Sequence, residues 1–384
     1  MAMVKYILEP NVMEWKPSKR MINRLQSTHG KKKRKVLTWC VTSLWILGAC
    51  TSGPNNSAEH AAQLQEIKGE TQGTTYTIKV VNGSVEIEKQ AIDSILHAFD
   101  LSLSGYHTES IISQLNASES TFEIPRSDSF FIHCLAVSEK IAKQTNGSFD
   151  PTVLPLIALW GFLKNTEKIP SQRQIDSTLA FIGFNNTKLW RLEENKQGHA
   201  FIKKDARLKL DFNAIAQGYS VDVIADYLRK KGCEDFYVEI GGELVVSGSN
   251  SEGTAWRIGI DKPVSSNDGK GSRVISAVLS VQNKGIATSG NYRKFYKKGG
   301  KIYAHTLHPK TGRPAENELL SATVVAENAA EADGMATAFM VMGLKESKQF
   351  LASHQEYEAF FIFTEKENEI SSFATKGMNK MLEK

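Results

Sequence analysis

The sequence contains few cysteines and none of the spacings that bind zinc. Its four cysteines, Cys40, Cys50, Cys134 and Cys233, form no Cys-x-x-Cys pair and no cluster with histidine. This excludes the common structural zinc sites. Cys134 and Cys233 are compatible with separate buried thiols or with a disulfide bond, and we favour separate thiols in the core.

A general charge bias is also lacking. The chain of 384 residues is 41% apolar and 23% charged, which is ordinary for a globular protein of one large or two medium domains. Its formal net charge of +5 is matched by one local basic run, Lys31–Lys35. No basic stripe interleaved with aromatic residues occurs elsewhere, so the composition gives no reason to expect nucleic-acid binding.

No apolar run is long enough for a comfortable transmembrane helix, but a shorter one follows the basic run. Residues 1–20 lack periodicity and are interpreted as an upstream extension, with Met21 a candidate initiator. The segment Val36–Ala49 is apolar and ends in Leu47-Gly48-Ala49-Cys50. Basic, apolar and small residues in this order are typical of a signal peptide, and the last four residues resemble the lipobox of bacterial lipoproteins.

We therefore expect residues 21–49 to be removed and Cys50 to carry lipid. Several acyl chains would hold the protein firmly on the extracytoplasmic side of a bacterial membrane; the pattern does not distinguish the inner from the outer membrane. An uncleaved anchor and a chance apolar run are the alternatives. Residues 50–66 are predicted to form the lipidated cysteine and a polar tether, and residues 67–384 one folded domain.

Strand and helix patterns alternate irregularly along this domain. Asn82-Gly83 after the strand-like residues 73–81 predicts a hairpin. Because the elements lack regular βαβ alternation, an α+β fold is favoured over a doubly wound α/β fold. The helical ranges are 85–99, 130–145, 170–182, 214–231, 327–343 and 344–354; further strands are expected at 190–192, 200–203, 208–212, 236–240, 244–247, 256–260, 275–281, 284–288, 321–326 and 357–364.

Asp333 and Thr337 form a candidate metal site within the stretch Glu327–Gly343. Their i, i+4 spacing places both side chains on one face of a helix, one turn apart. The many alanines around them favour a helix and allow close approach. Carboxylate and hydroxyl oxygens suit Mg²⁺, although a helix with one hydrogen-bonded aspartate explains this stretch equally.

The junction before the helix 214–231 is a second candidate site. A helix N-terminus offers free N–H groups and positive potential to a phosphate. A carbonyl near Ala214 could add a third oxygen to a metal. An ordinary helix capped by Asp211 or Asn213 is the alternative.

Other candidates are weaker when taken singly. The pair Gly241-Gly242 lets backbone approach a ligand, and residues 288–291 form a turn of small donors. His305 could transfer a proton or contact phosphate, and Tyr106 could stack on an aromatic ring. A tight hairpin, a plain turn, a structural histidine and half-buried packing are the corresponding structural explanations.

Taken in order, these stretches resemble the ApbE-type FAD:protein FMN transferases, a family of bacterial flavin-transferring lipoproteins. The resemblance extends from about Ile67 to the C-terminus, and the ordered set of motifs is specific. The motifs are Gly73-Thr74-Thr75-Tyr76, Ser104-Gly105-Tyr106, Ser113–Asn116, Gly147–Thr152, Leu210–Asp222, Glu239–Glu243, Ala287–Gly290, His305–Pro309, Thr311-Gly312 and Ala332–Thr337.

The resemblance implies a T-fold-like α+β architecture in two parts, with mixed or antiparallel sheets, packed helices and FAD between the parts. It implies Mg²⁺ held by the Ala214 carbonyl, Asp333 and Thr337. Gln217 stands where many members have Lys, and Glu239 and Glu243 where others often have Asn and Asp, so the two glutamates are assigned no role. The implied FAD contacts are Gln72, Tyr106, Ser148, Phe149, Asp150, Asp211, Gln217 and Leu307.

The implied activity is Mg²⁺-dependent transfer of FMN from FAD to a threonine hydroxyl of a target protein, with release of AMP. His305 is the candidate for assisting the hydroxyl or the leaving phosphate. The resemblance suggests a membrane-bound redox subunit as acceptor. A Mg²⁺-dependent FAD pyrophosphatase and a non-catalytic flavin-binding lipoprotein are the alternatives; Tyr at position 106 resembles the transferases, whereas Asn there resembles the hydrolases.

Overall fold

A computed structural model describes the chain in residues 63–83, 85–164, 166, 168–263, 274–291, 295–298, 301–304, 306–365 and 369–383. These residues belong to one compact unit, Glu59–Lys384. The predicted signal peptide, Cys50, nearly all of the predicted tether and His305 lie outside the described ranges. No helix within those ranges combines the length and apolar character needed to cross a membrane.

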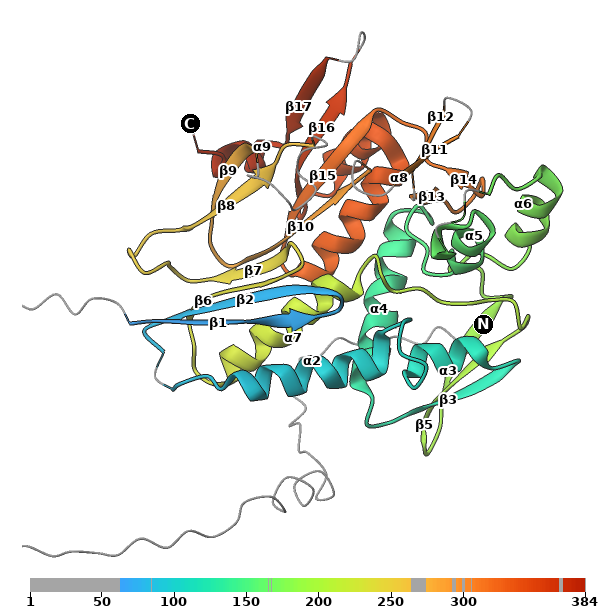
Figure 1. The fold of residues 1–384 in the computed structure, drawn as a ribbon, viewed down its shortest axis with the longest axis horizontal. Coiled ribbons are helices and arrows are strands. Elements are labelled where there is room, and N and C mark those ends of the chain that lie inside the picture. The colour runs from blue at the N-terminus through green and yellow to red at the C-terminus, as the bar shows by residue number, and fades with distance from the viewer. Residues whose placement is uncertain are drawn as a thin grey trace, which may run out of the picture. The chain divides into compact units, whose positions relative to one another are not determined.

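An eight-stranded sheet organises this unit, and every neighbouring pair of its strands is antiparallel (Figure 1). An antiparallel sheet packed with helices confirms the predicted α+β class. Strands from both ends of the described chain meet in this sheet. In spatial order they are β1 (Leu64–Thr71), β2 (Thr74–Val81), β6 (Asp235–Ile240), β7 (Glu243–Ser247), β10 (Lys284–Gly290), β15 (Leu319–Ala326), β16 (Glu358–Thr364) and β17 (Ile370–Ala374).

The central strands of this sheet are buried on both faces. Val324 of β15 and Phe361 of β16 belong to the core on one face, whereas their neighbours Val325 and Phe360 belong to the core on the other. Successive side chains of a strand point to opposite faces, so one sheet supports two cores. Helices α7 (Ala216–Lys230) and α8 (Ala329–Ser353) cover the first face; β8 (Trp256–Asp261), β9 (Ile275–Val281) and α9 (Lys376–Met381) cover the second (Figure 1).

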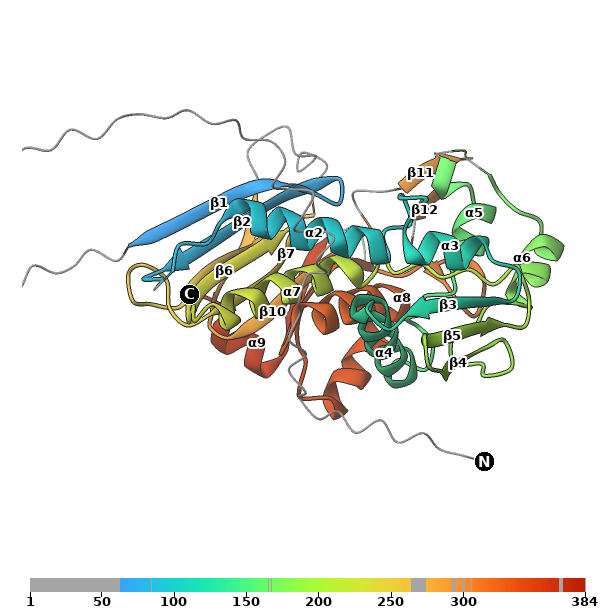
Figure 2. The same cartoon turned by 90° about the horizontal axis from the view of Figure 1, so that it is seen from below.

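The elements between β2 and α7 form a group beside α8. Helix α2 lies alongside α7 on the helical face of the sheet (Figure 2). The group comprises α2 (Lys89–Leu103), α3 (Ile111–Ala117), β3 (Thr121–Pro125), α4 (Ser129–Gln144), α5 (Leu154–Leu159), the 3₁₀ turn η1 (Phe162–Lys164), α6 (Gln172–Leu179), β4 (Trp190–Glu194) and β5 (Gly198–Lys203). Two hairpins follow β10: β11 (Phe295–Lys298) with β12 (Lys301–Ala304), and β13 (Leu307–His308) with β14 (Arg313–Pro314).

Two local predictions at the start of the domain are wrong. The first hairpin turns at Gln72-Gly73, whose φ values are 53° and 72°, and Asn82-Gly83 instead leads toward α2. Strand β1 begins at Leu64, inside the predicted tether. As an edge strand it alternates charged and small residues, so it lacks the apolar pattern by which strands are recognised.

The predicted strand at residues 208–212 does not form. A side chain holds this segment: Asn116 Nδ2 donates to the Leu210 carbonyl at 2.8 Å, and its Oδ1 accepts from Leu210 N at 2.7 Å. Side-chain bonds of this kind replace a strand partner. The predicted thiols of Cys134 and Cys233 are confirmed as free and buried.

We expect Gly285→Ala to lower the free energy of unfolding by about 1–3 kcal/mol, because β10 passes directly beneath the start of α8. A Cβ at Gly285 would lie 2.1 Å from the carbonyl carbon of Asn328 and 2.2 Å from Ala329 N. Urea denaturation measures the effect. Gly105→Ala is the control, since its Cβ would meet no atom within 4 Å; an equal loss in both variants would contradict the close approach.

Candidate functional site

The predicted metal ligand Asp333 lies where the starts of α7 and α8 approach each other. Its carboxylate is buried, and Oδ2 accepts a hydrogen bond from Gly218 N at 3.1 Å. A Cβ on Gly218 would lie 2.3 Å from the Ala329 carbonyl oxygen and 2.8 Å from Asp333 Cβ. Only glycine at position 218 allows the two helices to come this close.

The Ala214 carbonyl lies just before the cap residue of α7, outside the helix. The amide of Gly218 is one of the first of that helix, which have no acceptor within it, and it donates to Asp333. The cap residue Ile215 has non-helical angles, φ −155° and ψ −28°. Across the described part of the chain no amide donates to the Ala214 carbonyl, which leaves this oxygen free to bind a ligand.

Thr337 lies one turn beyond Asp333 on α8 and faces strand β10. Its Oγ1 is 3.2 Å from Ser289 Oγ, and the neighbouring Thr288 bonds Thr323 of β15 through their hydroxyl oxygens at 2.8 Å. The predicted turn at residues 288–291 is wrong, because residues 288–290 continue β10 and pair with β15. The structure places this end of the strand beside the helix that carries Asp333.

Burial raises the pKa of Asp333 to about 7, while the hydrogen bond from Gly218 acts in the opposite direction. A buried carboxylate with few donors is costly to ionise. A cation beside it would lower that cost. The electrostatics of Asp333 are therefore those of a group that gains from a metal ion.

Asp222 ties the two helices together at a second point. Its Oδ1 accepts from Ala329 N and its Oδ2 from Ala330 N, both at 2.8 Å. The first amides of α8 have no acceptor within their own helix, and the positive end of that helix favours a carboxylate. Sequence reasoning missed this role, because a carboxylate inside one helix carries no signal that it caps another.

The predicted nucleotide contacts Ser148, Phe149 and Asp150 form a turn after α4. The carboxylate of Asp150 accepts from Thr152 N, Thr152 Oγ1 and Phe184 N, at 2.8, 2.5 and 2.8 Å. Its side chain is thus used to hold the turn, and the amides of Ser148 and Phe149 donate to the carbonyl and hydroxyl oxygens of Thr145 at 3.1 and 3.2 Å. A Cβ on Gly334 would lie 3.6 Å from the Phe149 ring, so this turn packs next to Asp333 on α8.

Gln72 and Gln217 meet near the start of α7. Gln72 Oε1 lies 3.4 Å from Ser220 Oγ, while its buried Nε2 has no hydrogen-bond partner among the described residues. Gln217 Nε2 donates to the Ile240 carbonyl at 3.2 Å. A Cβ on Gly241 would lie 1.6 Å from that Nε2, so this glycine makes room for Gln217. Buried polar groups normally have a hydrogen-bond partner, so the Nε2 of Gln72 is a candidate donor to a ligand.

Asp211 connects the two halves of this arrangement. Its backbone N–H donates to the Pro151 carbonyl at 2.7 Å, and its Oδ1 accepts from Asn213 N at 2.8 Å. The first bond joins the turn at residues 148–152 to the segment that leads into α7. Asp211 therefore lies between the predicted nucleotide contacts and the Ala214 carbonyl.

Tyr106 and Leu307 are placed differently from the other predicted contacts. Tyr106, in the turn between α2 and α3, is 83% exposed and its ring is open to a partner. The Leu307 side chain is buried in a cluster with Leu156 and Trp160. The structure therefore leaves the Tyr106 side chain, but not that of Leu307, available for stacking.

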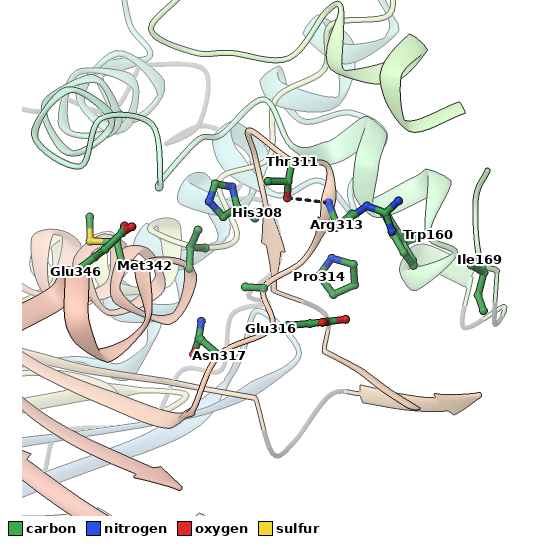
Figure 3. A pocket seen from close by; sticks show the side chains of 12 residues that line it. Trp160, Ile169, His308, Thr311, Arg313, Pro314, Glu316, Asn317, Met342 and Glu346 are labelled. Atoms are coloured by element: carbon green, nitrogen blue, oxygen red, sulfur yellow. Dashed lines mark hydrogen bonds between the residues drawn. The ribbon is translucent and has the colours of Figure 1, made fainter. Parts of the chain in front are cut away.

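A cavity of about 550 Å³ lies farther along α8 (Figure 3). None of the predicted flavin contacts or metal ligands lines it, although His308 and Thr311 of two sequence motifs do. Its lining residues are Trp160, Ile169, His308, Thr311, Arg313, Pro314, Ala315, Glu316, Asn317, Val341, Met342 and Glu346.

The chain is similar to known flavin transferases in sequence and in structure. The model of the ApbE family matches residues 72–361. The curated FAD:protein FMN transferase of Haemophilus influenzae is 32% identical over 83% of this chain and 91% of its own length; that of Escherichia coli K12 is 33% identical over 80% and 86%. The structure of the Vibrio cholerae flavin transferase ApbE superposes with a TM-score of 0.71 at 29% identity, covering 84% of this chain and 100% of that one.

We expect Asp222→Asn to flatten the pH dependence of stability. An unfolded aspartate titrates near about pH 4, whereas burial raises the pKa of Asp222 to about 7. Between these values the folded state holds more protons than the unfolded state, so stability falls as the pH rises, by at most about 1.4 kcal/mol per pH unit.

Urea denaturation at several pH values between about 5 and 7 tests this prediction. The unsubstituted chain should lose stability with rising pH more steeply than Asp222→Asn. Asp226→Asn, which removes an exposed carboxylate from the same helix, should keep the steeper dependence. The same slope in all three proteins would show that Asp222 does not titrate in this range.

Proposed function

Because the chain belongs to the ApbE family and is an FAD:protein FMN transferase, we propose that it transfers FMN to a threonine hydroxyl in a Mg²⁺-dependent reaction that releases AMP. The observation that carries the metal proposal is the junction at the start of α7, where the Gly218 amide donates to Asp333 and no amide of the described residues donates to the Ala214 carbonyl.

The oxygen atoms at this junction fit Mg²⁺. Asp333 offers a carboxylate, Thr337 a hydroxyl and Ala214 a carbonyl, and hard cations prefer such ligands. In the described ranges there is no cluster of three or more His, Cys, Asp or Glu side chains. The protein therefore supplies one carboxylate, which suits an ion that keeps water and phosphate oxygens in its shell. When bound, Mg²⁺ would neutralise charge on the diphosphate oxygens.

The residues around α7 would bind FAD. The start of α7 is a helix N-terminus with the potential that favours phosphate. The Nε2 of Gln72, which has no hydrogen-bond partner among the described residues, offers a buried donor, and the turn at residues 148–150 packs against α8 next to Asp333. The exposed ring of Tyr106 is free to stack on the isoalloxazine or the adenine.

In the proposed step the threonine Oγ forms a bond to the phosphorus of the FMN phosphate. The bond from that phosphorus to the bridging oxygen breaks, AMP leaves with that oxygen, and the hydroxyl proton is released. Positioning and charge neutralisation account for most catalysis of phosphoryl transfer. His305, which lies outside the described residues, is proposed to receive the proton or to contact the leaving phosphate.

Asp333→Asn should reduce Mg²⁺-dependent FMN transfer by about 100-fold or more, because an interaction worth several kcal/mol with the metal is lost. The amide oxygen can still accept from Gly218, so the helices keep their contact. The rate is followed by the FMN mass added to an acceptor. The Mg²⁺-induced rise in melting temperature should also disappear, and it should persist in the control Glu327→Gln. Normal transfer by Asp333→Asn would disprove the metal assignment.

The acceptor is identified by mass spectrometry of membrane proteins co-expressed with the chain, which should show an FMN mass on a threonine. FAD and Mg²⁺ with this acceptor should then yield covalent flavin and AMP together. Free FMN and AMP without covalent flavin would indicate a pyrophosphatase instead. FAD binding without any AMP would indicate a non-catalytic flavin-binding protein. A membrane-bound redox subunit is the acceptor that we propose.

We also propose that Cys50 carries the lipid that holds this enzyme at the extracytoplasmic face of a bacterial membrane. Cys50→Ser should move the chain from the membrane fraction to the soluble fraction, because hydroxyl replaces the sulfur that takes the lipid. Fractionation and intact-protein mass measure this. Cys40→Ser, within the predicted signal peptide, is the control and should leave the mature mass unchanged; an anchored Cys50→Ser protein would contradict the lipobox assignment.

A further inference from the structure

The cavity beyond the metal site has an apolar floor and a polar rim. Trp160, Ala315 and Val341 are buried at its base, whereas Arg313 and Glu316 are exposed at its edge. Figure 3 shows these residues arranged around the segment that follows β13, with α8 on one side and Trp160, at the end of α5, on the other. Protein-binding surfaces have this arrangement, in which an apolar centre is surrounded by polar groups.

The wall of the cavity is tied to α8 at a kink. Gly343 interrupts the helix with φ 75° and ψ 175°, and a Cβ there would lie 3.1 Å from Asn317 Cβ. Asn317 Nδ2 donates to the Met340 carbonyl at 2.9 Å, and its Oδ1 accepts from Leu319 N at 3.0 Å. One side chain thus joins the cavity wall to the helix that carries Asp333.

The cavity begins one turn beyond the proposed metal ligands. Val341 follows Thr337 by four residues, so both lie on one face of α8 before the kink. A molecule seated in the cavity therefore lies beyond the proposed metal ligands along α8 and next to Leu307, the predicted FAD contact that precedes His308 and packs with Trp160. Such a position suits a second substrate that must meet the bound FAD.

The rim offers carboxylates to a basic side chain. Glu316 and Glu346 line the cavity, and no lysine or arginine among the described residues forms a salt bridge with either. Arg313, which also lines the cavity, donates to Gln172 Oε1 instead. Burial, reinforced by Lys310, lowers the pKa of His308. Glu346 therefore presents a carboxylate beside an apolar floor, an arrangement that attracts a cationic side chain.

We propose that this cavity binds a segment of the acceptor protein, with one apolar side chain on the floor and a basic side chain beside Glu346. The inference rests on the transfer of FMN to a protein. It does not depend on threonine being the acceptor residue or on the proposed Mg²⁺ site. Like charges placed against each other across an interface are strongly unfavourable, so single substitutions that introduce or reverse a charge at the cavity should be sufficient to test it. Both Ile169 and Glu346 are exposed, so their substitution leaves the core intact.

The test compares Ile169→Asp and Glu346→Lys with the controls Leu163→Asp and Glu356→Lys, which change exposed residues outside the cavity. The probe is the purified acceptor that gains an FMN mass with the unsubstituted chain. The KM for this acceptor should rise about tenfold or more in the two cavity variants. The KM for FAD and kcat should stay within about twofold, and the controls should match the unsubstituted chain.

Reversing the charge of the acceptor's basic residue should restore the KM of Glu346→Lys. An unchanged acceptor KM in both cavity variants, an equal rise in the controls, or a rise in the KM for FAD would overturn the proposal; the last would place the nucleotide in the cavity. Failure of threonine transfer would appear already with the unsubstituted chain, whereas failure of this inference appears only in the comparison of variants.

Discussion

The hydrogen bond from Gly218 N to the Asp333 carboxylate is the contact on which the rest of the site depends. It requires glycine at position 218, because any Cβ would meet α8. The amide that it uses is one of the first of α7, which have no acceptor within their own helix. One contact between two helices therefore buries the carboxylate beside the segment of the Ala214 carbonyl, to which no amide of the described residues donates; these are two of the three oxygens proposed for Mg²⁺.

The sheet makes this contact possible and stabilises it from below. Gly285 lets β10 pass beneath the first residues of α8, and Ser289 of the same strand reaches Thr337. Asp222 offsets part of the cost of burying charge, since both its oxygens accept amides that α8 cannot satisfy itself. Asp222 and Asp333 nevertheless keep raised pKa values, so the junction is built at an electrostatic cost that a bound cation would reduce.

The secondary structure agrees with the sequence prediction where apolar residues recur at helical spacing and no distant segment determines the backbone conformation. The amphipathic ranges 130–145 and 214–231 match α4 and α7 within two residues. The prediction failed where a distant residue decides the conformation. Residues 208–212 have strand composition, but Asn116 takes up their backbone groups. The edge strand β1 is paired along its length with β2, although it has charged residues at positions 66, 68 and 70 and no regular alternation of apolar residues.

The sequence by itself determined the family, the α+β class and the pairing of Asp333 with Thr337, because helical spacing is a local property. Only the tertiary structure decided which atoms of the predicted residues remain available. It turned the Asp150 carboxylate inward, buried the Leu307 side chain and left Gln72 Nε2 without a partner among the described residues. It also formed the cavity at the α8 kink from segments far apart in the chain. Burial and hydrogen bonding between such segments depend on packing, and no local pattern encodes them.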